Sequence, residues 1–99
     1  METSFFFEEL QIPEFGEGVL FYGQATLSDD MGETDHFIVT EIRLAGGRYL
    51  RRPGREASTF SQMLFREIEM VLYDGKTVMG RHAAQEWSDF VSGSMQEAA

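Results

Sequence analysis

Four arginines within one short segment are the side chains in this sequence best suited to bind an anion. They are Arg48, Arg51, Arg52 and Arg55, with Tyr49 among them. A guanidinium group can donate paired hydrogen bonds to a phosphate or carboxylate, and an adjacent ring can stack on a base. The segment therefore predicts contact with an anion, and nucleic acid is one source. The alternative is a solvated hairpin end whose arginines pair with Glu8, Glu9 or Glu41 across the sheet.

The carboxylates give a different signal, because ten of them lie in the first 42 residues, which contain no lysine or arginine. Such a surface can steer the encounter with a basic protein partner, and we expect a small interaction protein such as an inhibitor, an immunity-like protein or a phage-encoded accessory factor. The candidate contact residues are Glu8, Glu9, Glu14, Glu17, Asp29, Asp30, Glu33 and Asp35. The net charge of −9 disfavours nucleic acid and anionic membrane as partners, and it favours the solvated interpretation of the arginines. Solubility alone is the competing explanation of the charge.

Patterns for metal binding and catalysis are weak. Residues 29–35 hold four carboxylates, but their spacing does not match a calcium-binding EF-hand loop, and turn formation explains them as well. His82 and Glu86 lie one helical turn apart, with His36 as a remote third ligand and no cysteine in the chain. A nucleophile elbow, a Walker loop and a dinucleotide fingerprint are all missing from the sequence. We expect no enzyme activity, no metal and no cofactor.

The composition indicates a folded chain. The 99 residues are 42% hydrophobic and 13% aromatic, which is too apolar for a disordered acidic chain and suits a single domain. The N-terminus lacks the pattern of a signal peptide, and no segment is long and apolar enough to predict a membrane span. We therefore expect a cytoplasmic protein.

Alternating apolar and polar residues predict four strands, over residues 3–10, 19–28, 36–45 and 48–52. In the first strand, Phe5 and Phe7 should face one side and Phe6 the other. Residues 29–35 form the expected loop of a hairpin, and Gly46-Gly47 form a tighter turn. Short polar connections of this kind join antiparallel neighbours.

The longest segment without glycine or proline, residues 58–73, predicts a helix. Its expected buried stripe comprises Phe60, Met63, Leu64, Ile68, Val71 and Leu72. Ser58 or Thr59 can cap its start, and Gly75 can end it with a positive φ. Because residues 67–73 also alternate, a hairpin turning at 74–75 stays open as the less favoured alternative over residues 65–79.

A second helix is predicted over residues 82–91. Ser92-Gly93-Ser94 should end it, leaving residues 92–99 as a frayed tail. The expected fold is a small two-layer α+β domain, an antiparallel sheet of about four strands followed by two helices packed on one face. The uncovered face would keep Phe6, Leu20, Tyr22, Phe37 and Val39. Self-association, including a homodimer with a structural role, could cover that face.

Overall fold

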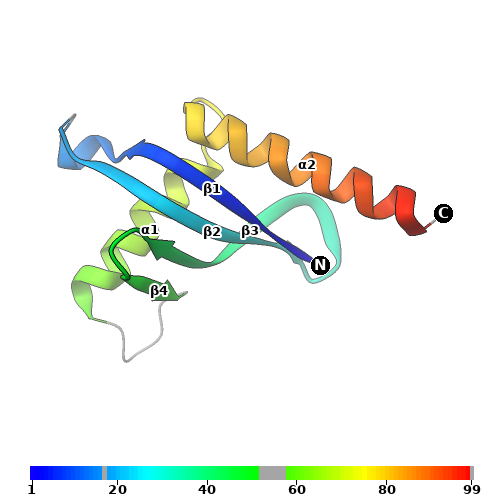
Figure 1. The fold of residues 1–99 in the computed structure, drawn as a ribbon, viewed down its shortest axis with the longest axis horizontal. Coiled ribbons are helices and arrows are strands. Elements are labelled where there is room, and N and C mark those ends of the chain that lie inside the picture. The colour runs from blue at the N-terminus through cyan, green and yellow to red at the C-terminus, as the bar shows by residue number, and fades with distance from the viewer. Residues whose placement is uncertain (17, 52–57, 99) are drawn as a thin grey trace.

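The computed structural model describes residues 1–16, 18–51 and 58–98, and it confirms the predicted architecture of a four-stranded antiparallel sheet with two helices (Figure 1). The strands follow the chain in the order β1-β2-β3-β4 across the sheet. Their bounds are β1 Glu2–Gln11, β2 Leu20–Asp30, β3 Glu33–Leu44 and β4 Tyr49–Arg51. A 3-10 turn, η1, spans Pro13–Phe15, and the helices are α1 Thr59–Tyr73 and α2 Val78–Ala98.

The core lies between one face of the sheet and the two helices. Helix α2 contacts β1 and β3, and α1 contacts β4 and α2. Phe5 and Phe7 are buried in this core, whereas Phe6 is 74% exposed on the opposite face, as the alternation predicts. Leu20 and Tyr22 are also exposed. Self-association through this open face remains a prediction.

Strand β3 departs from the predicted alternation because it contains a bulge. Thr26 pairs with Glu41, but the next residue of β2, Leu27, pairs with Val39, so Thr40 is an extra residue. One extra residue reverses which side chains face the core. Phe37 and Val39 are consequently buried, and the prediction that they line the uncovered face is wrong.

The hairpin between β2 and β3 is tighter at its tip than predicted. Met31 and Gly32 form the turn, with φ values of 50° and 92°, and β3 begins at Glu33. The predicted loop of residues 29–35 is therefore wrong in its extent. Below the tip, Asp30 pairs with Glu33 and Ser28 pairs with Ile38. Between these two pairs β2 has one residue, Asp29, whereas β3 has four, residues 34–37. The longer segment of β3 therefore bows away from β2.

Helix α1 settles the choice between a helix and a hairpin in favour of the helix. The side chain of Ser58 caps its start by accepting a hydrogen bond from the backbone N–H of Ser61 at 3.1 Å, as predicted. The buried residues are Leu64, Phe65, Ile68, Val71 and Leu72. Phe60 is 50% exposed and Met63 is also exposed, so these two do not belong to the buried stripe. Among the described strands, α1 mainly contacts the three-residue strand β4, which is too short to cover the first turn of the helix.

The end of α1 differs from the prediction, because its C-cap is Asp74 in an extended conformation and not a glycine with a positive φ. Gly75 does not adopt a positive φ. The hydroxyl of Thr77 lies 2.9 Å from the carbonyl oxygens of Val71 and Asp74, and it accepts a hydrogen bond from the N–H of Gly80. Thr77 thus caps α2, which starts at Val78 instead of residue 82.

The predicted end of α2 is also wrong. The helix continues through Ser92, Gly93 and Ser94 to Ala98, and Figure 1 shows its last turns extending beyond the strands. A glycine in a helix costs only about 1 kcal/mol relative to alanine, and no proline follows to break the ladder. The prediction of a frayed tail over residues 92–99 therefore fails for its described part, and Ala99 lies outside the described residues.

Candidate functional site

The predicted acidic residues fall into two groups at opposite ends of the sheet. Glu8, Glu9 and Glu14 lie where β1 leads into η1, and residues 29–35 lie at the hairpin end, beside the start of β1 (Figure 1). About six strand residues separate the groups, or about 20 Å. Glu17 lies outside the described residues. The N-terminal half therefore presents two separate acidic surfaces.

A bulge in β1 builds the first acidic surface. The register with β2 shifts between Phe7 and Leu10, and Glu9 has a φ of 56°. Phe7 and Leu10 are both buried, and the two residues between them, Glu8 and Glu9, are both exposed. A regular strand would turn one of any two neighbouring residues toward the core. The bulge thus places two carboxylates side by side at the surface.

These glutamates line a groove of about 630 Å³ between the end of β1 and the junction of the two helices, which we call the acidic groove. Its carboxylates are Glu8, Glu9, Glu14, Glu67 and Asp74. Its apolar lining includes Met70, Val71, Val78 and Met79. No lysine, arginine or histidine is among the residues that line it, so the groove combines negative charge with an apolar surface.

Charge in the acidic groove is uncompensated within the described residues. None of its five carboxylates forms an ion pair with a described cation. Asp74 accepts a hydrogen bond at 2.9 Å from the backbone N–H of Lys76, which is an uncharged donor. A cation supplied by a partner would therefore find unpaired carboxylates here.

Of the four acidic residues at the hairpin end, Asp29, Asp30 and Asp35 already have partners, whereas Glu33 is exposed. Nε2 of His36 lies 3.1 Å from Asp30, and its Nδ1 lies 3.2 Å from Asp35. The hydrogen bond with Asp30 is the main cause that raises the pKa of His36 above its usual 6.5. Asp29 accepts hydrogen bonds from the terminal amine of Met1 and from the N–H of Gly32, and these contacts lower the pKa of Asp29.

An aromatic pocket of about 720 Å³ adjoins this hairpin end, between the bowed part of β3 and helix α2. The ring of Phe37 lies 5.5 Å from that of Tyr73 and 6.3 Å from that of Trp87, centroid to centroid. The indole N–H of Trp87 donates to the carbonyl oxygen of Thr34 at 3.0 Å. Phe37 and Trp87 are buried, whereas the other residues that line the pocket are exposed or partly buried, so the pocket is open at the surface beside these two rings.

The arginine segment lies at the other edge of the sheet from β1. Arg48, Tyr49 and Arg51 are described, whereas Arg52 and Arg55 lie outside the described residues. Because β1 and β4 are opposite edges, Glu8 and Glu9 do not neighbour these arginines. Glu41 is the register partner of Arg51, but the two form no ion pair. Instead, the Glu41 carboxylate accepts hydrogen bonds from the hydroxyls of Tyr49 and Thr26.

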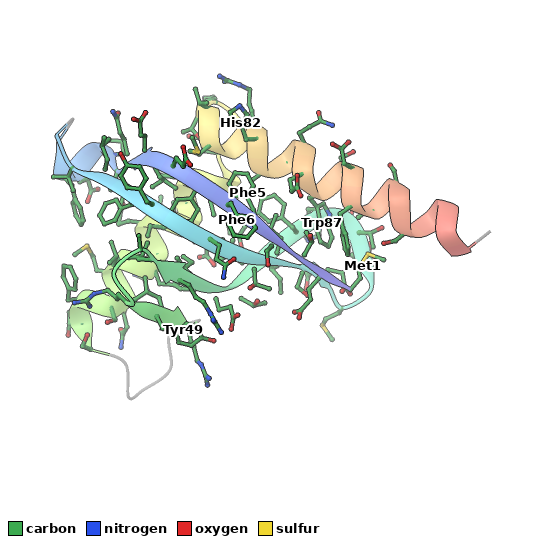
Figure 2. The ribbon with its side chains drawn as sticks, viewed as in Figure 1. Met1, Phe5, Phe6, Tyr49, His82 and Trp87 are labelled. Atoms are coloured by element: carbon green, nitrogen blue, oxygen red, sulfur yellow. The ribbon has the colours of Figure 1, made fainter. Side chains whose placement is uncertain are left out.

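The weak metal candidates stay apart. His82 and Glu86 are exposed on α2, and Figure 2 shows His82 on the side of the helix away from the sheet. His36 is held at the hairpin end, close to Asp30 and Asp35. Across residues 1–16, 18–51 and 58–98, no three histidine or carboxylate side chains are grouped so that they could hold a metal ion.

Sequence reasoning missed the part of the acidic groove that comes from α1. Glu67, Met70 and Asp74 are spaced by three and four residues, which places them along one stripe at the surface of the helix. That spacing is a readable signal. The position of the stripe beside the β1 bulge follows only from the packing of α2 against β1 and α1.

In the part of the chain that the structure describes, no helix is both long and apolar enough to cross a membrane. Comparison of the chain with protein-family models, with curated proteins and with solved structures found no match.

Proposed function

We propose that the protein is a non-enzymatic cytoplasmic binding domain whose acidic groove accepts a basic, amphipathic segment of a partner protein. The observation that carries this proposal is the set of five groove carboxylates without a described cationic partner. Charged groups that already lie at their positions attract and orient a cationic ligand without reorganising the protein. A partner segment with two or three lysines or arginines matches this charge.

The apolar part of the acidic groove suggests how such a segment is anchored. Met70 is 57% exposed and Val78 is 52% exposed, although both are apolar. Methionine is flexible and polarisable, so it adapts to side chains of different shapes. An apolar side chain of the partner can pack on these two residues while its basic neighbours meet the carboxylates. This is the pattern by which amphipathic helices dock into grooves.

The acidic groove is a better candidate than the hairpin end. Asp30 and Asp35 contact His36, and Asp29 contacts the terminal amine and Gly32. A partner's cation would have to replace these existing contacts. Of the eight predicted contact residues, Glu8, Glu9 and Glu14 therefore support the proposal, together with Glu67 and Asp74 from the helical side.

A displayed random library of peptides about 12 residues long tests the proposal directly. The full chain serves as bait at low ionic strength. We expect enrichment of peptides with lysine or arginine beside a leucine, methionine or aromatic residue. Binding of a selected peptide should weaken at least about tenfold when the salt concentration rises from about 0.05 M to about 0.5 M.

Matched charge variants locate the binding surface. A Glu8→Gln, Glu14→Gln, Glu67→Gln triple variant should lower the affinity for the selected peptide at least about tenfold. The control is Glu2→Gln, Glu33→Gln, Glu86→Gln, which changes the net charge equally at exposed positions outside the groove. Equal losses in both variants would show that only net charge attracts the peptide. Enrichment of peptides without basic residues would contradict the proposal outright.

A further inference from the structure

The open face of the sheet carries a second polar site, at the hairpin between β3 and β4. A pocket of about 440 Å³ is lined by Arg43, Leu44, Gly47, Arg48, Tyr49 and Arg51, which we call the arginine pocket. Three of its six lining residues are arginines and none is a carboxylate. Local positive charge of this kind is unusual in a chain with a net charge of −9.

Strand register explains why Arg43 and Arg51 converge. Leu50 pairs with Ile42, and both are buried toward the helices. Tyr49 and Arg51 flank Leu50, so they point to the open face. Arg43 is the direct cross-strand partner of Tyr49 and shares that face. Figure 2 shows Tyr49 on β4, on the side of the molecule away from α2.

Aromatic rings hold the guanidinium groups in place. The guanidinium carbons of Arg43 and Arg51 lie 5.0 Å and 5.2 Å from the centroid of the Tyr49 ring. Arg48 precedes Tyr49 and lies 5.2 Å from the centroid of Phe60 on α1, so its guanidinium group is directed toward the helices at the edge of the pocket. A guanidinium group that stacks on a ring keeps its N–H donors directed outward in its own plane. Preordered donors lose less conformational entropy when they bind an anion.

Nothing described occupies those donors. Within residues 1–16, 18–51 and 58–98, none of the three arginines forms an ion pair with a carboxylate. Glu41 is the nearest carboxylate by register, and it accepts hydrogen bonds from Tyr49 and Thr26. It thereby orients the Tyr49 hydroxyl, and on the open face the two positive charges of Arg43 and Arg51 stand beside one negative charge.

We propose that the arginine pocket binds a small ligand that carries phosphate groups. Arginine forks match the geometry of phosphate oxygens. The pocket favours a small ligand over a nucleic-acid strand because the positive charge does not continue along the described sheet face. The other described cations, Arg66, Lys76 and Arg81, belong to the helical side. The net negative charge of the protein would also repel a long polyanion.

Titration of the ¹⁵N-labelled full chain with sodium pyrophosphate, in phosphate-free buffer of low ionic strength, tests this proposal by NMR. We expect the largest shifts at the backbone amides of Gly47, Tyr49 and Arg51. Inorganic phosphate should bind at the same residues more weakly, because it offers fewer oxygens to the arginines. Shifts that spread evenly over all cationic residues, or no shifts with either anion, would overturn the proposal.

Two variants of equal charge separate a built site from general attraction. An Arg43→Gln, Arg51→Gln double variant should lower the affinity for pyrophosphate at least about tenfold. An Arg66→Gln, Lys76→Gln control should change the affinity by no more than about twofold. Circular dichroism confirms that both variants fold. Equal weakening in both variants would overturn the proposal.

A third arm distinguishes the sources of phosphate. A single-stranded oligonucleotide of about ten nucleotides is titrated under the same conditions. Pyrophosphate binding with little or no oligonucleotide binding supports the small-ligand site. Oligonucleotide binding without pyrophosphate binding overturns it and identifies nucleic acid as the ligand. This result would leave the acidic groove unaffected, because the peptide experiment uses variants at other residues.

Discussion

Gly80 approaches Asp74 so closely that a Cβ atom at position 80 would lie 1.9 Å from the carbonyl oxygen of Asp74. The same Cβ would lie 2.7 Å from Oγ1 of Thr77, the residue that caps α2. Only a glycine fits this contact without movement of the backbone. The pair fixes the junction of α1 and α2, and this junction forms one side of the acidic groove.

Replacement of Gly80 by alanine should therefore destabilise the protein by about 3 kcal/mol, because the new methyl group must displace backbone atoms. Urea unfolding followed by circular dichroism measures the change in the free energy of unfolding. An unchanged midpoint would show that the junction can relax at little cost.

Gly93 provides the opposite prediction on the same helix. A Cβ atom at position 93 meets nothing within 4 Å, and the residue lies inside α2. Gly93→Ala should stabilise the protein by about 0.5–1 kcal/mol, because alanine loses less backbone entropy in a helix. The two variants add the same methyl group to the same helix, so the comparison isolates the close contact at Gly80. Destabilisation by Gly93→Ala would imply that the last turns of α2 are not helical in solution.

The fold could be predicted because its signals are local and repeated. The alternation of Phe5 and Phe7 with Phe6 predicts which face of β1 is buried. The spacing of the apolar residues from Leu64 to Leu72 predicts the buried side of α1. Bulges leave no such signal. The extra residue Thr40 in β3 reverses its faces, and the shift beside Glu9 in β1 exposes two adjacent glutamates. Both are adjustments of strand pairing that depend on tertiary packing.

The candidate sites were predictable only in part, for the same reason. The sequence identifies Glu8, Glu9 and Glu14 as acidic candidates. Their distance in space from residues 29–35 follows only from the antiparallel pairing of β1 with β2, which places the start of β1 beside the hairpin and its end far from it. The sequence does not group Arg43 with the other arginines, because four residues of strand and turn separate it from Arg48. The pairing of Arg43 with Tyr49 brings it into the arginine pocket.

The pKa of His36 should lie above 6.5, because hydrogen bonds to Asp30 and Asp35 stabilise its charged form. The raised value means that His36 stabilises the folded state fully below pH 6.5, and that this contribution is lost as the pH rises through the folded pKa. NMR titration of the imidazole signals measures the pKa of His36. Asp30→Asn should lower the pKa of His36 toward 6.5, whereas Glu86→Gln on α2 should leave it unchanged. A His36 pKa at or below 6.5 in the unmodified chain would refute the pairing.

The pKa of Glu41 should lie below 4.5, chiefly because the Tyr49 hydroxyl donates to its carboxylate. Here the stabilisation is present above pH 4.5 and is lost as the pH falls through the folded value. Tyr49→Phe removes the donor and should raise the pKa of Glu41, as measured by NMR of the side-chain carboxyl carbon. Tyr22→Phe, on the same sheet face, is the control and should have no effect. An unchanged Glu41 pKa in Tyr49→Phe would mean that Thr26, Arg43 and Arg51 set its value without Tyr49.

Trp87 links α2 to the bowed part of β3 by a hydrogen bond as well as by packing. Its indole N–H donates to the carbonyl oxygen of Thr34, and its ring contacts Phe37 and Phe90. Trp87→Phe keeps an aromatic ring in the core but removes the donor. The loss of one part-buried hydrogen bond and some packing should cost about 2 kcal/mol.

Hydrogen exchange distinguishes the two contributions of Trp87. If the hydrogen bond holds the bowed segment, the amides of residues 34–37 should exchange faster in Trp87→Phe, while those of β1 change only with global stability. Trp87→Leu removes the ring as well, and should lower stability further with the same local pattern. Faster exchange spread evenly over the sheet in Trp87→Phe would instead assign Trp87 a purely packing role. The bow of β3 would then depend on the Met31–Gly32 turn and the contacts of His36 with Asp30 and Asp35.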